Sequence, residues 1–304
     1  MALLDLVAVG EAFQDLIFVG LPHMPRSGEE LRTAAFVATI GGGAVITSIA
    51  ASRLGLRTGI VSALSAEAIG TLRKDRVRVI NLKRANEPHA VTVSLSTKRD
   101  RSFVTFNGVN DRLEARLQAQ VVRQRTRHVH LAFAPRDCSR WARIVGGLRA
   151  RGVSTSWDFG WNPPLRRARG FDELAGSSDF IFVNEAEAAL YGRARRLSAA
   201  LSFWRRTGRN TIIKLGPRGS RWIVGDSDVS ASAPRVRVVD TTGAGDAFNG
   251  GFLTAWLNGG SQRDCLRLGN FVGSQSTRAP GGVLALPRRL AGETCGVGRV
   301  GRSG

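Results

Sequence analysis

Short apolar segments alternate with helical segments through the second half of this chain, and that order constrains the fold more than any other feature. The pattern predicts strands at 128–132, 153–158, 180–183 and 211–215, with helices at 139–150 and 185–191 between them. Helices that connect parallel strands cover both faces of their sheet. The sequence therefore predicts an α/β fold with a mostly parallel central sheet.

The first 110 residues show this alternation of strands and helices only in part. An apolar strand is expected at 4–9, a helix from the glycines at 41–43 to about residue 54, and another strand at 59–64. Further strand candidates lie at 31–38, 77–80, 90–95 and 102–106, and the last two form a hairpin pattern. These extra strands predict a small separate sheet beside the core.

A glycine-rich turn at 240–246 is the strongest chemical signal. It lies between an expected strand at 234–239 and an apolar helix at 247–257. Gly243 and Gly245 let the backbone approach a ligand, and the first N–H groups of the helix lack internal partners and attract anions. Asp246 beside a phosphate could take the proton of an attacking alcohol. The alternative is an ordinary strand-to-helix turn with an acidic first-turn residue.

A second polar group follows the strand at 180–183. Ligands of an open α/β sheet bind beyond the carboxyl ends of its strands, so Asn184 and Glu187 are expected at the same edge as Asp246. Their oxygens suit Mg²⁺ held through water beside a phosphate. The same spacing also fits a helix capping box, and both roles are compatible.

Two further glycine turns follow the same logic. Gly216 and Gly219 come after Lys214 at a strand end, where a nucleotide could lie over the turn or a simple hairpin could form. Gly41–Gly43 opens a helix and could hold a phosphate or a sugar. Asp15 can accept hydrogen bonds from two adjacent hydroxyls, although a solvated strand residue is the plainer interpretation.

The overall composition limits which partners and which compartment we expect for the chain. The net charge is +20, but the basic residues are 40 arginines and four lysines spread along the whole chain, so a basic surface is favoured over nucleic-acid binding. Three distant cysteines have no metal-ligand spacing and fit a reducing, cytoplasmic compartment. No segment has the length of a membrane span, and residues 1–9 read as a buried strand.

Together these motifs resemble the ribokinase/PfkB family of carbohydrate kinases, from about residue 4 to residue 287. The resemblance rests on the 240–246 turn and its helix, Asn184-x-x-Glu187, Lys214-Leu-Gly-x-x-Gly, and Gly10-Glu11 with Asp15 before the glycines. It implies a three-layer α/β/α sandwich with a small β-sheet lid over the sugar. We take 1–290 as the kinase domain, with the lid at about 12–38 and 88–108, and expect a disordered tail at 291–304.

The resemblance also implies an activity, which is ATP-dependent phosphorylation of a sugar hydroxyl. Asp246 would be the base, and Gly243, Ala244 and Gly245 would form the anion hole. The nucleotide would be bound by Lys214, Gly216, Gly219, Thr242 and Asn270, and Mg²⁺, through water, by Asn184 and Glu187. The sugar would be bound by Asp15, Gly42 and Gly43, and K⁺ by Asp240, Thr242 and Gly281. Pairing of lid strands between subunits would give a homodimer.

Two positions depart from the family pattern. Ile46 stands where an asparagine is usual, and an aliphatic side chain cannot hydrogen-bond a sugar hydroxyl. The segment 65–79 is short, and a lost or truncated helix there would uncover part of the core. Alternatives to a sugar kinase are a nucleoside kinase of the same fold and a non-catalytic sugar or nucleotide binder.

Overall fold

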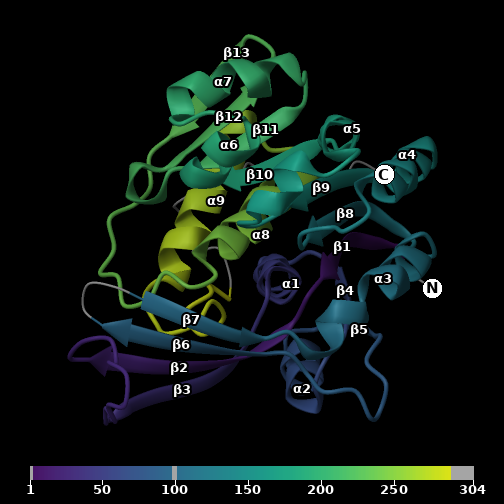
Figure 1. The fold of residues 1–304 in the computed structure, drawn as a ribbon. Helices are drawn as coiled ribbons and strands as arrows, with labels where there is room; N and C mark the ends of the chain where they lie inside the picture. Colours follow the sequence, from purple (N-terminus) through teal and green to yellow (C-terminus); the bar gives the residue numbers. More distant parts are fainter. Residues whose placement is uncertain (1–2, 98–100, 289–304) are drawn as a thin grey trace.

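The computed structural model describes residues 3–97 and 101–288, which form a large sheet covered by helices and a smaller sheet beside it (Figure 1). The strands are β1 (Leu4–Gly10), β2 (Phe13–Leu21), β3 (Ala35–Gly41), β4 (Thr58–Ser62), β5 (Arg78–Asn81), β6 (Val91–Thr97), β7 (Arg101–Phe106), β8 (Thr126–Ala132), β9 (Ser154–Asp158), β10 (Phe180–Asn184), β11 (Asn210–Lys214), β12 (Ser220–Val224) and β13 (Ser227–Ala231). The helices are α1 (Gly43–Arg53), α2 (Ala66–Lys74), α3 (Glu114–Val121), α4 (Cys138–Ala150), α5 (Phe171–Ser177), α6 (Glu185–Tyr191), α7 (Leu197–Arg206), α8 (Ala244–Leu257) and α9 (Gln262–Ser276).

The central sheet has the strand order β13-β12-β11-β10-β9-β8-β1-β4-β5. Its strands are parallel from β11 to β5, and β12 and β13 run antiparallel at one edge. The chain leaves β1 towards β4 and β5, and later resumes on the other side with β8. Such a reversal is the point at which open α/β sheets bind ligands. The predicted α/β fold is confirmed.

Alternate residues of the central strands face two separate cores. Leu6 and Ala8 point to the core shared with α1, α8 and α9, whereas Val7 and Val9 point to the core of α3 to α7. All seven residues of β1 are buried, as expected for a parallel strand covered on both faces. This packing confirms the three-layer α/β/α arrangement.

The smaller sheet, which we call the lid, has the order β3-β2-β6-β7 and lies along the bottom of Figure 1. Asp15, Ile17 and Thr39 on one of its faces are buried. The opposite face carries exposed Phe36, among others. The predicted small sheet is confirmed, but the strand expected at 31–38 forms at Ala35–Gly41 instead.

The expected strand at 234–239 is wrong. The residues between β13 and Asp240 form no regular secondary structure, and Val238 and Val239 are exposed. The segment does not pair with β13, which forms the edge of the sheet. The chain passes instead to the end of α9, where the N–H groups of Val239 and Asp240 donate to the Thr277 carbonyl at 2.7 and 3.1 Å.

A helix is also not lost at 65–79. Helix α2 forms there, and Ser65 caps it by accepting a hydrogen bond from the Ala68 N–H at 3.1 Å. Ala68 and Leu72 are buried against the core, so this region is covered. The predicted disordered tail at 291–304 lies outside the described residues.

Candidate active site

The turn at 240–246 forms the start of α8, as the sequence predicts. Gly243 is left-handed, with φ 70°, and Ala244 begins the helix. Among the described residues, the amides of Gly243 and Gly245 have no hydrogen-bond partner, whereas the Ala244 amide donates to the Thr241 carbonyl at 3.3 Å. Two of the three predicted anion-hole donors are therefore available at the positive end of the helix dipole.

Close packing explains why this turn needs glycine. A Cβ atom on Gly243 would collide with the side chain of Ile46 and lie 2.9 Å from the Gly282 Cα. Ile46 is buried in this contact and does not line the cavity described below. Its aliphatic side chain therefore supports the turn from behind.

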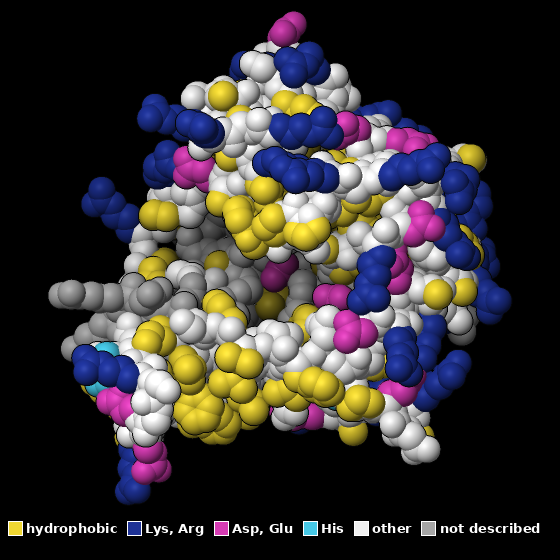
Figure 2. Space-filling view, in the orientation of Figure 1, with side chains coloured by type: hydrophobic (Ala, Val, Ile, Leu, Met, Phe, Trp, Pro, Cys, Tyr) yellow, Lys and Arg dark blue, Asp and Glu magenta, His cyan; other side chains and the backbone are white. Residues whose placement is uncertain are grey.

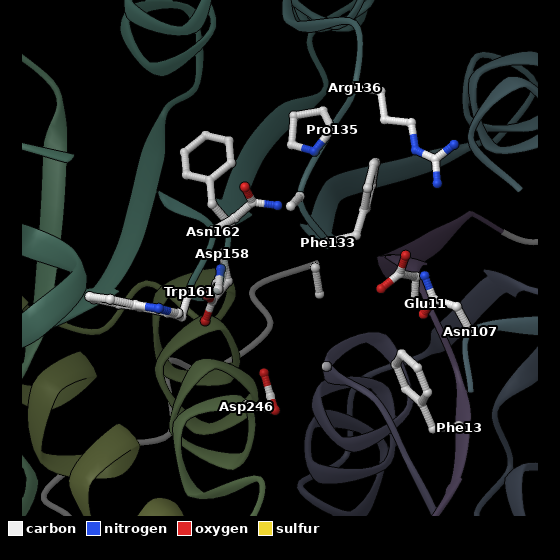
Figure 3. Close-up of a pocket in the computed structure, with 15 residues that line it drawn as sticks. Glu11, Phe13, Asn107, Phe133, Pro135, Arg136, Asp158, Trp161, Asn162 and Asp246 are labelled. Atoms are coloured by element: carbon white, nitrogen blue, oxygen red, sulfur yellow. Dashed lines mark hydrogen bonds between the residues drawn. The ribbon is translucent and has the colours of Figure 1, made fainter. Parts of the chain in front are cut away.

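Asp246 points from the first turn of α8 into a cavity of about 490 Å³ (Figure 3). We call it the Asp246 cavity; it is lined by Glu11, Phe13, Gly43, Asn107, Ala132, Phe133, Ala134, Pro135, Arg136, Asp158, Phe159, Gly160, Trp161, Asn162 and Asp246. Figure 2 shows acidic side chains inside a cleft between the lid and the core. The cavity therefore lies beyond the carboxyl ends of β1, β8 and β9, at the reversal of strand order.

The carboxyl group of Asp246 makes no hydrogen bond with the described residues. Burial, and then the negative charge of Asp158, raise its pKa to about 7, while Lys214 acts in the opposite direction. A carboxylate with a pKa near the working pH can both accept and release a proton efficiently. Its place in the cavity and its raised pKa make Asp246 a candidate for a proton-accepting group.

Of the predicted sugar-binding residues, Gly43 lies against Asp246 and lines the cavity, whereas Gly42 and Asp15 are not among its lining residues. A Cβ atom on Gly43 would lie 2.9 Å from Asp246 Oδ1, and Gly42 has φ 103°. The start of α1 thus reaches Asp246 only because glycine occupies it. Asp15 on β2 packs against Gly41, and burial followed by the charge of Asp240 raises its pKa to about 7.

Asn184 and Glu187 form the capping box of α6. The Asn184 side chain accepts from the Glu187 N–H at 2.9 Å, and Glu187 Oε2 accepts from the Asn184 N–H at 2.8 Å. Glu187 Oε1 has no hydrogen-bond partner among the described residues. Burial, and then the charge of Asp158, raise the pKa of Glu187. The capping interpretation is confirmed, and one oxygen stays available for a cation.

Asp158, which the sequence analysis treated only as a strand end, belongs to the site. Its Oδ2 accepts from Lys214 Nζ at 2.7 Å and from Asn249 Nδ2 at 2.8 Å. Burial disfavours both charges, yet the ion pair holds the pKa of Asp158 below and that of Lys214 above its usual value. The signal was present, because Asp158 ends β9 at the same edge where Asn184 and Lys214 end β10 and β11.

The turn after Lys214 is a hairpin between β11 and β12. Gly216 and Gly219 have φ 59° and 97°, and the Leu215 N–H donates to the Gly219 carbonyl at 2.8 Å. Lys214, Gly216 and Asn184 line a groove of about 890 Å³, which we call the Lys214 groove. Asn270 lies elsewhere on α9, buried, where its amide donates to the carbonyls of Ala231 and Ser232.

The three predicted potassium-site residues lie together. Asp240 Oδ1 accepts from the N–H and hydroxyl of Thr242 at 3.0 and 2.8 Å, and Oδ2 accepts from the Gly281 N–H at 2.8 Å. The buried carboxylate thus joins the anion-hole turn to a second loop. In the part of the chain that the structure describes, no group of three or more His, Cys, Asp or Glu side chains could hold a metal ion.

Comparison with known proteins decides the family. The family described as pfkB family carbohydrate kinase matches residues 3–289 of the sequence. The chain belongs to this family of carbohydrate kinases. It is therefore a phosphotransferase. Separately, within residues 3–97 and 101–288 no helix has the length and apolar character to cross a membrane.

Relatives of this PfkB-family kinase include several kinds of kinase. The 2-dehydro-3-deoxygluconokinase of Bacillus subtilis (strain 168) is 28% identical over 260 residues, covering 78% of this chain and 80% of that protein. Arabidopsis thaliana ribokinase, solved with ribose and ATP, is 25% identical with a TM-score of 0.72 over 94% and 96% of the two chains. Adenosine kinase from Sinorhizobium meliloti has the same fold, with 22% identity and a TM-score of 0.80 over 94% and 98%.

Proposed function

We propose that this kinase transfers the γ-phosphoryl group of ATP to a sugar hydroxyl, with Asp246 as the general base. One observation carries the proposal. The half-buried Asp246 carboxyl group points into a cavity beside the amides of Gly243 and Gly245, and none of these three groups has a hydrogen-bond partner among the described residues. A base for the acceptor and donors for the phosphoryl oxygens therefore lie within one turn of α8.

The residues divide the work as follows. An acceptor hydroxyl in the Asp246 cavity gives its proton to the Asp246 carboxylate as its oxygen attacks the γ-phosphorus. The bond between that phosphorus and the bridging oxygen of ADP breaks in line. The amides of Gly243 and Gly245 donate to the phosphoryl oxygens as negative charge redistributes. In this scheme Asp15, Gly42 and Gly43 hold the sugar.

The Lys214 groove suits the nucleotide because it meets the anion-hole turn at Lys214 and includes the open hairpin at Gly216. We place Mg²⁺, bound through water, beside Asn184 and Glu187. The raised pKa of Glu187 and its unpaired Oε1 fit such a cation, which would offset the local excess of carboxylates. When bound, Mg²⁺ neutralises charge on the phosphates.

We also place a monovalent cation, K⁺, beside the buried carboxylate of Asp240, with Thr242 and Gly281. A cation there would fix the loop that carries the anion hole. Turnover in KCl should exceed turnover in choline chloride of equal ionic strength. Equal rates in the two salts would refute this placement.

A nucleoside acceptor is the second candidate, because aromatic side chains line the Asp246 cavity. Phe13 and Trp161 offer flat apolar surfaces on which a base could stack, while Phe133 and Phe159 are buried behind the cavity wall. Glu11, Asn107 and Asn162 offer hydrogen-bonding groups to a polyol instead. A non-catalytic binder is disfavoured, because such a protein has no use for a carboxyl group with a raised pKa and no hydrogen-bond partner among the described residues.

The test is a screen of sugars and nucleosides for ADP release with MgATP. The Asp246→Asn protein, assayed beside the wild type, measures the background of ATP hydrolysis and contaminating kinases. Turnover with a sugar that exceeds turnover with every nucleoside supports the proposal, and the reverse ranking supports the second candidate. No acceptor-dependent ADP release from a folded wild-type protein would refute both.

We infer a homodimer formed through the outer face of the lid. The strand register places Phe36, Val104 and Phe106 on the face opposite Asp15, with exposed fractions of 53%, 67% and 57%. Figure 2 shows hydrophobic side chains gathered over this sheet. Val104→Lys should yield a monomer in analytical ultracentrifugation, whereas Val238→Lys, exposed outside the lid, should not. A monomeric wild type would refute the inference.

Two further proposals, on location and on partners, rest on the sequence alone. We infer a cytoplasmic location from the cysteine usage, and no nucleic-acid partner from the dispersed arginines. Retention on heparin or DNA at physiological salt would contradict the second.

A further inference from the structure

The Asp158–Lys214 ion pair lies on the boundary between the two cavities. Asp158 lines the Asp246 cavity, and Lys214 lines the Lys214 groove. Figure 3 shows Asp158 and Asp246 at the same wall of the Asp246 cavity. A phosphoryl group that passes from a nucleotide in the groove to an acceptor in the cavity therefore passes this pair.

The pair is buried, and Asn249 contacts both of its members. The side chains of Lys214 and Asp158 are only 13% and 10% exposed. Asn249 on α8 donates to Asp158 and lies 3.4 Å from Lys214 Nζ through its Oδ1. Burial disfavours both charges, and the attraction between them does little more than offset that cost, so stability alone is a poor explanation for the pair.

The ammonium group lies beside the anion hole. A Cβ atom on Gly245 would be 3.0 Å from Lys214 Nζ, so the absence of a side chain at Gly245 leaves room for the lysine. Three other carboxylates, those of Asp158, Glu187 and Asp15, raise the pKa of Asp246, and the cation Lys214 lowers it. This cation is the group best placed to meet a phosphoryl oxygen at the turn.

We propose that Asp158 and Asn249 position the ammonium group of Lys214 beside Gly245, where it adds a fixed positive charge to the anion hole. Lys214 is then a catalytic residue that contacts the transferred phosphoryl group, and Asp158 and Asn249 are positioning residues. This inference rests on the proposed function, because it assigns the phosphoryl path to the boundary between the two cavities.

Lys214→Met is the first test, with Lys74→Met on α2 as the matched control. We expect Lys214→Met to lower kcat roughly 100-fold, the usual effect of removing one such donor, with little change in either KM. Lys214→Arg keeps the charge and should recover part of that loss. Asp158→Asn leaves the lysine unpositioned and should lower kcat about tenfold to 100-fold.

The pH profile separates this role from a structural one. Asp246 is faced by Asp158 on β9, Lys214 on β11, Glu187 on α6 and Asp15 on β2, and Asp158 is faced also by His130 on β8. Loss of the lysine charge should move the acid limb of kcat/KM to higher pH. Loss of the Asp158 charge should move it to lower pH. If the acid limb shifts in the same direction in both variants, or in neither, the proposed positioning of Lys214 by Asp158 is wrong.

An acceptor-independent measurement completes the design. Aluminium fluoride with MgADP mimics the transferred phosphoryl group, so it should tighten MgADP binding by the wild type. Lys214→Met should keep MgADP affinity and lose this enhancement, while Lys74→Met keeps both. Retention of the enhancement by Lys214→Met would overturn this inference alone. A wild type that binds neither MgATP nor MgADP would overturn the proposed function, and the inference with it.

Discussion

The substitution Asp246→Asn should inactivate the enzyme and at the same time stabilise the fold. The pKa of Asp246 rises from 3.8 to about 7 in the folded protein. At about 1.36 kcal/mol per pH unit, that rise corresponds to ~4 kcal/mol of unfavourable free energy when the group ionises. Asparagine has nearly the same shape and no charge. No hydrogen bond with the described residues is lost, because the Asp246 side chain makes none.

The stabilisation should depend on pH with a defined sign. Because the folded pKa lies above the unfolded value, the native state binds more protons between the two values, and stability falls as pH rises through this window. The penalty is absent below pH 3.8 and complete above about pH 7. The variant should therefore gain little at pH 4 and up to ~4 kcal/mol at pH 8, which raises Tm on the order of 5–10 °C.

The same substitution that raises the stability should lower the turnover rate. Loss of a general base lowers kcat by about 10²- to 10⁴-fold, and the wild-type kcat/KM should fall about tenfold per pH unit below the pKa. ADP release and calorimetry at pH 5 and pH 8 measure both effects. Asp172→Asn, which breaks an exposed ion pair with Arg193, is the control. Wild-type turnover in Asp246→Asn would refute the base, and a variant less stable at pH 8 would refute the buried-charge argument.

Three other substitutions test the rest of the site. Glu187→Gln should raise the Mg²⁺ concentration for half-maximal turnover about tenfold, with the sugar KM unchanged; an unchanged Mg²⁺ requirement would contradict the assignment. Gly243→Ala should lower both the stability and kcat. The control is Gly259→Ala, which is also at positive φ but has open space around it, and which should lower the stability only. Equal kcat values for the two variants would count against the anion hole. Ile46→Asn should lower stability by ~1–3 kcal/mol without improving the sugar KM, because it buries an unpaired amide; a better KM would show that residue 46 reaches the sugar.

The strand-end motifs were predictable because each depends on local chemistry. Glycine at a helix start and the Asn-x-x-Glu spacing act within a few residues, and the capping box of α6 begins at the expected residue. The segment 234–239 failed for the opposite reason. Its alternation of valine and arginine is typical of a strand, but the end of the segment makes its hydrogen bonds to Thr277 at the end of α9 and not to a strand.

Asp158 shows the same limit within the site. In sequence it is only the last residue of a strand, 56 residues before the lysine that pairs with it. Nothing local indicates that the two meet, because the pairing depends on β9 and β11 lying on either side of β10. Ile46 likewise reads as a lost sugar ligand until packing places it against Gly243.

The sequence by itself determined the α/β fold, the small second sheet and the glycine turn with its carboxylate, because periodicity, turns and helix starts are local properties of the chain. Only the tertiary structure decided that Asp246 is half-buried without a partner among the described residues, that Lys214 lies beside Gly245, and that an ion pair lies between the two cavities. Burial and charge–charge distances arise when distant strands are brought to one sheet edge. They set the pKa values on which the chemistry depends.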